Sequence, residues 1–201
     1  MAGSQAKGSK PDSASAGLKK HHLRNEIGHS KARMKIRKNS AWRDKALRTT
    51  ESAPIIDWLR DRGSLTARLQ TKGSFAVRLL RQELAKPTND EIQALGLTRT
   101  CKVRVREVVL MCDGEALVFA HTALSTKPRG AMSLWFARLG TRSLGALLFA
   151  HAGFIRGTIN CKRIDHRHAL FGPAINALHL AAAPPSALWA RRSLFTYGKQ
   201  S

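Results

Sequence analysis

The stretch Lys102–Leu124, KVRVREVVLMCDGEALVFAHTAL, is the most informative part of the sequence for the fold class. Two runs rich in Val, Leu and Phe flank Asp113-Gly114, and an Asp-Gly pair between such runs is a strong signal for a β-hairpin with a two-residue turn. Alternate residues of a strand face opposite sides, and both faces of the run 103–110 are partly apolar, so we predict a central strand. One face carries Val103, Val105, Glu107 and Val109, and the other carries Arg104, Arg106, Val108 and Leu110.

Upstream of the hairpin, the stretch 57–70, DWLRDRGSLTARLQ, predicts two short helical pieces broken by Gly63. Ser64 stands where it can cap the second piece. Leu65 and Leu69 are four residues apart and therefore share one helical face. Such a broken pair of helices is either ordinary core architecture or a hinged lid over a pocket.

The remaining elements complete an α+β pattern. Helices and strands are segregated along the chain, which favours a single domain with an antiparallel β-sheet covered by helices over a doubly wound fold. Further strands are predicted where Phe75, Val77 and Leu79 alternate, over 153–164 and over 189–197, and helices over 131–140, closed by Gly140, and over 143–151.

The basic charge is concentrated at the start of the chain. Of 201 residues, 35 are Lys or Arg and 13 are Asp or Glu, which gives a formal net charge of +22. Residues 1–40 are poor in large apolar side chains and are predicted to be a disordered basic tail, with the folded domain over 41–201. The tail could contact RNA, DNA or acidic lipid without specificity. The alternatives are a solvated tail, or a true start at Met34.

Several classes of protein are disfavoured. There is no run of eighteen apolar residues to span a membrane, and the first residues lack the apolar segment of a secretory signal. Cys101, Cys112 and Cys161 form no CxxC pair, so reduced thiols in a cytoplasmic protein are expected. We find no phosphate-binding glycine motif, no GxSxG motif and no recognisable helix-turn-helix or RNA-binding signature.

Three places carry residues capable of chemistry. Arg104 and Arg106 are costly to bury without an anion, so they could grip a ligand carboxylate; the alternatives are pairing with Glu107 of a neighbouring element, or exposure at a strand end. His121 could act as a general base or be a histidine hydrogen-bonded in place. The run 165–168, DHRH, has histidines two residues apart, which suits an exposed loop at least as well as a metal site, and no metal is assigned.

Four segments in order resemble those of the chorismate pyruvate-lyase family, bacterial enzymes that open the ubiquinone pathway. The resemblance covers roughly Trp42 to Lys199. The segments are DWLRDRGSLTARLQ (57–70), VREVVLMCDGE (105–115), LGTRSLGALLF (139–149) and WARRSLFTY (189–197).

This resemblance implies an antiparallel sheet with helix-turn-helix flaps around a buried site, in a cytoplasmic monomer. It implies cleavage of chorismate to 4-hydroxybenzoate and pyruvate without cofactor or metal. Arg106 matches the arginine that grips a carboxylate, Leu144 matches a leucine that contacts the ring, and Leu65 matches a flap position. The stretch 57–70 is then one of the lids.

The resemblance has one departure at the C-terminal end. Family members continue into a further strand that carries a Thr-Glu step, and that glutamate lies near the hydroxyl end of the ligand. Here the sequence ends at Ser201, so no residue is matched to that glutamate and no catalytic residue is assigned. We expect a C-terminally truncated domain in which activity must be tested.

Two other functions compete with the lyase. One is a non-catalytic module of the same fold that binds a small anion, like the effector-sensing domain of some bacterial transcription regulators. The other is a nucleic-acid binder that acts through the charge of the tail alone.

Overall fold

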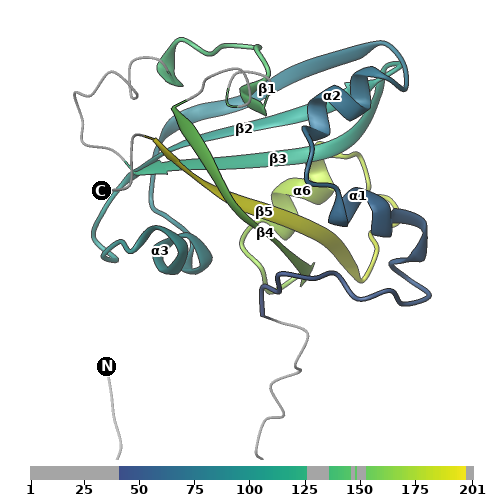
Figure 1. Ribbon diagram of the computed structural model, residues 1–201, viewed down its shortest axis with the longest axis horizontal. Coiled ribbons are helices and arrows are strands. Elements are labelled where there is room, and N and C mark those ends of the chain that lie inside the picture. The colour runs from purple at the N-terminus through teal and green to yellow at the C-terminus, as the bar shows by residue number, and fades with distance from the viewer. Residues whose placement is uncertain (1–40, 126–135, 146–147, 149–152, 198–201) are drawn as a thin grey trace, which may run out of the picture. The chain divides into compact units, whose positions relative to one another are not determined.

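The computed structural model describes residues 41–125, 136–145, 148 and 153–197 (Figure 1). The predicted tail over 1–40, and parts of the helices predicted over 131–140 and 143–151, lie outside these ranges. In chain order the elements are η2 (Ala53–Ile55), α1 (Ile56–Arg60), α2 (Leu65–Gln70), β1 (Phe75–Ala85), α3 (Asn89–Leu95), β2 (Val103–Cys112), β3 (Glu115–Ser125), β4 (Phe154–Asp165), α6 (Phe171–Ala177) and β5 (Ala187–Tyr197).

The predicted hairpin is confirmed. Strands β2 and β3 pair antiparallel, and both Asp113 and Gly114 of the turn have positive φ, at 51° and 83°. This backbone twist suits a two-residue hairpin turn, and Asp and Gly tolerate it better than most residues. The Asp113 carboxylate also accepts a hydrogen bond from the Ser74 backbone N–H at 2.8 Å, which ties the turn to the start of β1.

The predicted central position of β2 is also confirmed, because β1 and β3 flank it in a three-stranded antiparallel sheet. A bulge near Leu80 interrupts the register of β1 between Leu79 and Arg81. Leu79 lies opposite Val108, whereas Arg81 lies opposite Glu107, so the alternation is reset by one residue. The bulge therefore determines on which face of the sheet each side chain after Leu80 in β1 lies.

Strands β4 and β5 form a separate two-stranded antiparallel sheet. The α+β class is confirmed, but the strands that the structure describes make two sheets and not the one sheet expected. In this part of the chain β3 and β5 each pair on one side only (Figure 1).

The predicted break in the stretch 57–70 is confirmed. Helix α1 ends at Arg60, and α2 begins at Leu65 after Ser64, whose hydroxyl accepts a hydrogen bond from the Ala67 backbone N–H at 3.2 Å. Each helix is too short to be stable alone, so packing must hold it in place.

The two short helices pack on different sheets. Ile56 and Leu59 of α1 form a buried cluster with Cys161 of β4, and Trp189 of β5 packs against it. Leu69 of α2 is buried with Val108 and Leu110 of β2, and Leu65 and Trp58 pack against that cluster. Burying a side chain of this size contributes about 1.5–3 kcal/mol. The α1–α2 pair therefore ties the two sheets together.

Helices α3 and α6 were not among the predicted elements. Thr88 and Glu91 form a complete capping box at the start of α3, and Gly96 ends the helix with a φ of 61°. The sequence signal for α3 was thus present, as a threonine followed three residues later by a glutamate. Helix α6 buries Phe171 and Ile175 against Ile164 of β4.

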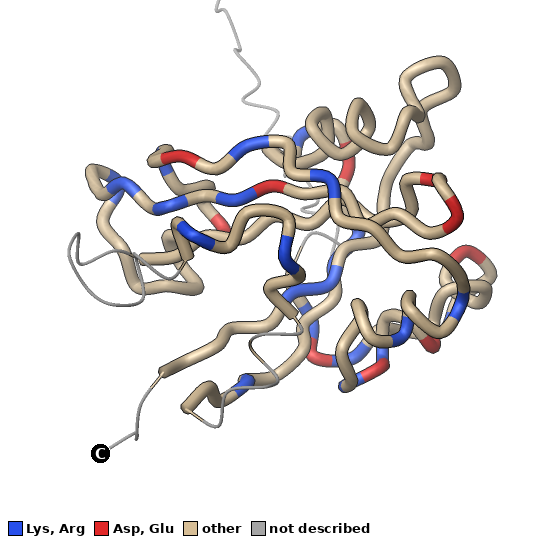
Figure 2. Tube along the Cα trace, turned by 90° about the horizontal axis from the view of Figure 1, so that it is seen from above, with Lys and Arg blue, Asp and Glu red and all other residues tan. Residues whose placement is uncertain are grey.

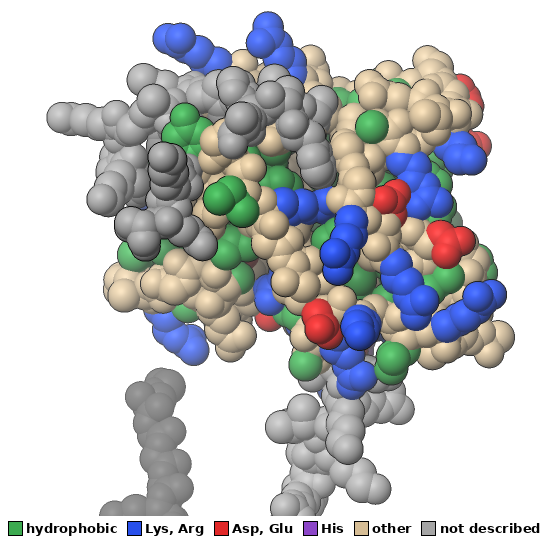
Figure 3. Space-filling view, viewed as in Figure 1, with side chains coloured by type: hydrophobic (Ala, Val, Ile, Leu, Met, Phe, Trp, Pro, Cys, Tyr) green, Lys and Arg blue, Asp and Glu red, His purple; other side chains and the backbone are tan. Residues whose placement is uncertain are grey.

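Charged residues lie within the strands as well as in the loops (Figure 2). Figure 3 shows Lys and Arg side chains gathered over the half of this face that holds β4 and β5. Among the helices that the structure describes, none combines the length and the apolar character needed to cross a membrane. Cys101, Cys112 and Cys161 are free thiols.

Candidate active site

A row of polar side chains crosses the middle of the three-stranded sheet. Arg106 of β2 lies opposite Gln82 of β1 and Thr122 of β3, so the three side chains share one face. The next row on one side pairs Val108 with Ala120. On the other side, Arg104 lies between Leu84 and Leu124. The row that holds Arg106 is therefore a polar stripe between largely apolar neighbours.

Arg106 is buried, with 2% of its surface exposed. Its Nη2 donates hydrogen bonds to the backbone oxygens of Gly140, at 2.8 Å, and Arg142, at 2.9 Å. Its Nε is buried and has no hydrogen-bond partner in the described part of the chain, where no carboxylate lies within ion-pair distance either. Burial lowers the pKa of Arg106, because desolvation disfavours the charged form.

This arrangement favours an anionic ligand. A buried guanidinium is costly unless its charge is compensated, and backbone carbonyls supply only part of that compensation. The geometry of a guanidinium matches a carboxylate, which can accept two of its N–H groups at once. The alternatives considered for Arg106, a strand-end location or an ion pair with Glu107, are wrong.

The segment 136–142, whose carbonyls bind Arg106, turns at a glycine. Residues 136–137 are helical, and Gly140 has a φ of 53°, which agrees with its predicted role in ending a helix. Phe136 and Leu139 of this segment are buried. Because Arg106 of β2 binds the carbonyls of Gly140 and Arg142, it fixes the position of this turn and therefore of residues 143–145 that follow it.

Those residues contact helix α2. The Ser143 hydroxyl donates to the Thr66 hydroxyl at 2.9 Å. A Cβ atom placed on Gly145 would lie 3.2 Å from Thr66 Oγ1, so the segment approaches the start of α2 closely. Leu144 and Leu65 thus belong to two segments in direct contact.

The structure therefore brings the three predicted ligand-binding residues into one region. Arg106 contacts the turn that leads into Leu144, and Leu65 packs against a cluster that contains Val108, the next residue on the Arg106 face. Leu65 and Leu144 are each partly buried. Their roles toward a ligand stay predictions.

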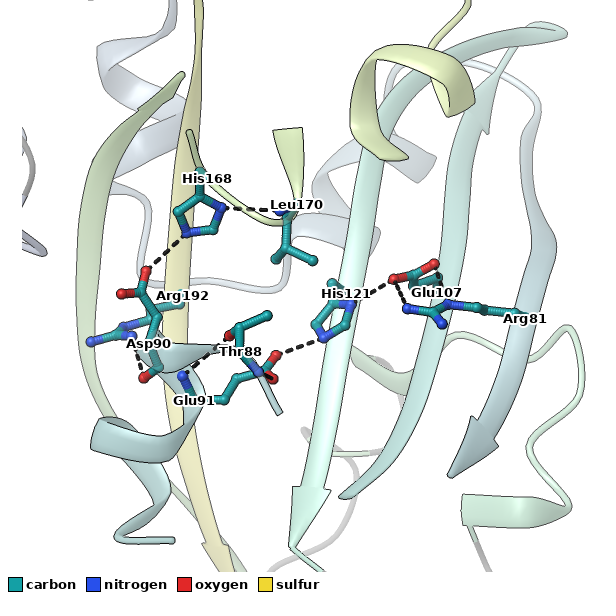
Figure 4. A network of polar contacts seen from close by, with 9 residues as sticks. All are labelled: Arg81, Thr88, Asp90, Glu91, Glu107, His121, His168, Leu170 and Arg192. Atoms are coloured by element: carbon teal, nitrogen blue, oxygen red, sulfur yellow. Dashed lines mark hydrogen bonds and ion pairs between the residues drawn. The ribbon is translucent and has the colours of Figure 1, made fainter. Parts of the chain in front are cut away.

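The opposite face of the sheet carries an ion network that is partly buried (Figure 4). Arg81 donates to both carboxylate oxygens of Glu107, at 2.7 and 2.8 Å. His121 Nδ1 lies 2.9 Å from Glu107, and its Nε2 lies 2.6 Å from Glu91 of α3, in an ion pair rather than a well-aligned hydrogen bond. Glu107 is 5% exposed. The network holds α3 against the sheet.

His121 lies on the face away from Arg106, so the structure supports the interpretation of a histidine hydrogen-bonded in place, and not a base beside Arg106. Burial by itself would lower the pKa of His121, but the ion pairs with Glu91 and Glu107 outweigh it and raise that pKa. Burial by itself would raise the pKa of Glu107, but Arg81 and His121 lower it.

A second polar cluster surrounds Asp90, the residue after the start of α3. One of its carboxylate oxygens receives contacts from Trp42 Nε1 at 2.6 Å, Lys162 Nζ at 2.9 Å and His168 Nε2 at 2.9 Å. Burial would raise the pKa of Asp90, but the hydrogen bonds from His168, Lys162 and Trp42 outweigh it and lower that pKa to about 2. The guanidinium of Arg192 lies 4.2 Å from the centre of the Trp42 ring.

The run 165–168 does not form a metal site. Asp165 accepts a hydrogen bond from the Arg167 backbone N–H at 3.0 Å, while His168 contacts Asp90. Across the ranges that the structure describes, no group of three His, Cys, Asp or Glu side chains is placed to bind a metal ion.

Two arginines of the β4–β5 sheet hold the turn between α1 and α2, a role that no pattern in the sequence predicted. Arg191 Nη1 donates to the backbone oxygens of Trp58 and Asp61, the latter at 3.1 Å. Arg156 Nη1 donates to those of Arg62, at 2.6 Å, and Gly63, at 3.1 Å. A Trp-Ala-Arg-Arg-Ser run on a strand shows basic residues but not which distant carbonyls they reach.

Comparison with known proteins gives a consistent result. The family model described as chorismate lyase matches residues 36–201. A protein of Dechloromonas aromatica (strain RCB), named probable chorismate pyruvate-lyase, is 46% identical over 164 residues, which span 81% of this chain and 90% of the relative. A protein of the same name from Aromatoleum aromaticum (strain DSM 19018 / LMG 30748 / EbN1) is 44% identical over 168 residues, which span 81% of this chain and 88% of the relative. With a match over most of its length and relatives this similar, the chain belongs to the chorismate lyase family.

Proposed function

We propose that this chain cleaves chorismate into 4-hydroxybenzoate and pyruvate. The observation that carries the proposal is Arg106, a buried cation without a carboxylate partner among the described residues, placed beside the segments of Leu65 and Leu144. The relatives named probable chorismate pyruvate-lyase support the same substrate. The proposed product would enter ubiquinone synthesis, and the proposed location is the cytoplasm.

The chemistry needs positioning more than it needs a reactive group. Chorismate carries two carboxylates, and the bond between ring C3 and the enolpyruvyl oxygen breaks while a hydrogen leaves ring C4. The ring becomes aromatic, and the released enol takes up a proton at its methylene carbon to give pyruvate. Aromatisation supplies a large driving force, so the enzyme mainly holds a reactive conformer and stabilises shifting charge.

In this mechanism Arg106 binds the ring carboxylate, and the regions of Leu65 and Leu144 close over the ring. The carbonyls of Gly140 and Arg142 fix the guanidinium through Nη2. The remaining N–H groups of Arg106 can then donate to the carboxylate without reorganisation of the side chain, which is what preorganised electrostatic stabilisation requires.

The test is a direct assay. Purified protein, its C-terminus confirmed by intact mass, is incubated with chorismate, and 4-hydroxybenzoate is measured by chromatography against the uncatalysed background. We expect product in proportion to enzyme concentration. A folded protein that forms no product but binds 4-hydroxybenzoate would instead be a non-catalytic anion-binding module of the same fold.

A further inference from the structure

Arg104 lies beside Arg106 on the same face of β2. Residues two apart on a strand are roughly 6.6 Å apart, because the rise is about 3.3 Å per residue. Arg104 is half-buried, and its Nε is buried with no hydrogen-bond partner in the described ranges. The face of the sheet that carries Arg106, Gln82 and Thr122 therefore holds two adjacent cations, Arg104 and Arg106.

Among the described residues, no neighbour neutralises the charge of Arg104. Its partners in register are Leu84 on β1 and Leu124 on β3, both apolar. No carboxylate of the described segments forms an ion pair with Arg104, whereas Arg81, on the other face of the same sheet, pairs with both Glu83 and Glu107. Two like charges this close repel each other, and an anion that spans both would remove that cost.

Gln82 adds an acceptor to the same face. Its Nε2 donates to the Ala137 backbone oxygen at 2.9 Å, which fixes the orientation of the amide. Its Oε1 is buried and has no hydrogen-bond partner in the part of the chain that the structure describes. Orphaned buried polar atoms are rare in native proteins and call for an explanation. Here Arg104 and Arg106 each contribute an orphaned N–H donor, which a carboxylate can accept, whereas the Gln82 oxygen beside them requires a donor such as a hydroxyl group.

We propose that Arg104 binds the second carboxylate of a dicarboxylate ligand whose first carboxylate is bound by Arg106. Arg104 then sets the selectivity of the site for a dianion over a monoanion. This inference rests on the proposed function for the identity of the ligand, in which the second carboxylate is that of the enolpyruvyl group. Loss of that group as pyruvate would leave a product that no longer engages Arg104.

The experiment uses two probes that differ in one carboxylate and cannot be turned over. These are 3-methoxybenzoate and 3-(carboxymethoxy)benzoate, titrated into the full-length protein by calorimetry at fixed ionic strength. In the Arg104→Gln variant, we expect roughly tenfold or greater loss of affinity for the dicarboxylate, because a hydrogen bond to a charged group is lost. Affinity for the monocarboxylate should change by less than about threefold.

Two variants serve as controls. Arg106→Gln should weaken both probes, because both carry the ring carboxylate. Arg99→Gln removes one positive charge from an exposed position outside the strands and should change neither affinity appreciably. Circular dichroism of each variant establishes that it is folded.

The proposal is overturned if Arg104→Gln weakens both probes equally or neither, or if the wild-type protein shows no preference for the dicarboxylate. The chorismate assay separates this result from the proposed function. If dicarboxylate binding depends on Arg104 but chorismate is not turned over, the proposed lyase activity is wrong and the proposed role of Arg104 stands. If chorismate is turned over but dicarboxylate binding does not depend on Arg104, the lyase activity stands and the role of Arg104 is wrong.

Discussion

Arg106 and Glu107 are neighbours on β2, but their side chains lie in different environments. The side chain of Arg106 meets backbone carbonyls and no described carboxylate, while that of Glu107 is neutralised by Arg81 and His121. Strand alternation alone separates these environments, because successive side chains point to opposite faces. One face therefore carries a buried guanidinium without a carboxylate partner among the described residues, whereas the charges on the other face are paired with one another.

Replacing Arg106 by Ala should lower kcat/KM by a factor equivalent to several kcal/mol, because the carboxylate of the ligand would be buried without its partner. Arg106→Lys should recover only part of the activity, since an ammonium group cannot form the same fork. Steady-state kinetics on chorismate measures both effects, with thermal unfolding as the check on folding. An unchanged kcat/KM in the alanine variant would remove Arg106 from the site.

Replacing His121 by Gln should make the protein less stable in a pH-dependent way. The raised pKa of His121 means that its contribution is fully present below the ordinary histidine value of about 6.5 and is lost as the pH rises through the folded-state pKa. The lowered pKa values of Glu91 and Glu107 mean that their contributions are present above the ordinary glutamate value of about 4.3 and are lost in acid.

The difference in unfolding free energy between wild type and His121→Gln should thus be largest between about pH 4.3 and 6.5, at about 3 kcal/mol, and should shrink at higher pH. Urea unfolding at a series of pH values measures it. A difference that grows as the pH rises above 7 would mean that His121 is neutral in the folded protein.

Among the elements, the pair α1–α2 has the most distinctive position. Helix α1 packs on β4–β5, α2 packs on β1–β3, and the turn between them is bound by Arg156 and Arg191. Arg68 adds an ion pair to Asp61 at 3.1 Å and lies 4.0 Å from the centre of the Trp58 ring. The predicted lid is therefore anchored at its hinge, and α2 is the part whose packing on β2 must change if the lid opens.

Replacing Arg191 by Met should release the hinge. Two hydrogen bonds from a charged, largely buried donor are lost, so we expect a loss of about 2 kcal/mol in stability and faster hydrogen exchange at the amides of 61–66. If the lid closes over chorismate, KM should rise more than kcat falls. Arg163→Gln, which removes the partly exposed ion pair with Glu51 and a long hydrogen bond to the Ser186 hydroxyl at 3.5 Å, is the matched control and should cost less than about 1 kcal/mol. Equal exchange rates in the two variants would argue against the hinge.

Over the whole molecule, the net charge of +22 has two locations. Residues 1–40 contain ten Lys or Arg against two acids. The rest lies in the domain, partly on the face over β4 and β5 (Figure 3). The first described residues are bound to the rest of the domain, because Trp42 contacts Asp90 of α3 and Arg43 exchanges backbone hydrogen bonds with Cys161 of β4.

Removing residues 1–40 should leave the melting temperature and kcat/KM unchanged, since these ties lie beyond the deletion. The affinity for single-stranded DNA should fall strongly. The salt dependence of that affinity should also become weaker, because each phosphate contact contributes to the slope of log K against log salt. Fluorescence anisotropy at several salt concentrations measures this. If the shortened protein keeps the slope, the basic face of the domain carries the binding, and the tail is only a solvated extension.

The features that depend on neighbouring residues could be predicted from the amino-acid sequence. The hairpin at Asp113-Gly114, the cap at Ser64 and the glycine that ends the segment at Gly140 follow from local backbone preferences, and all three are present. The capping box of α3 was equally readable, while α6, short and with Pro173 in its first turn, gave only a weak signal.

The partners of the charged side chains could not be predicted in this way, because they depend on long-range packing. The bulge in β1 places Arg81 opposite Glu107, and long-range packing brings His121 to Glu91, Arg106 to Gly140 and Arg191 to Asp61. These groups are far apart in sequence, and which of them meet depends on strand register and on the apolar surfaces that drive each element into place. Local preferences shape each element, but the pairing of charges, and with it the candidate site, is set by how those elements pack.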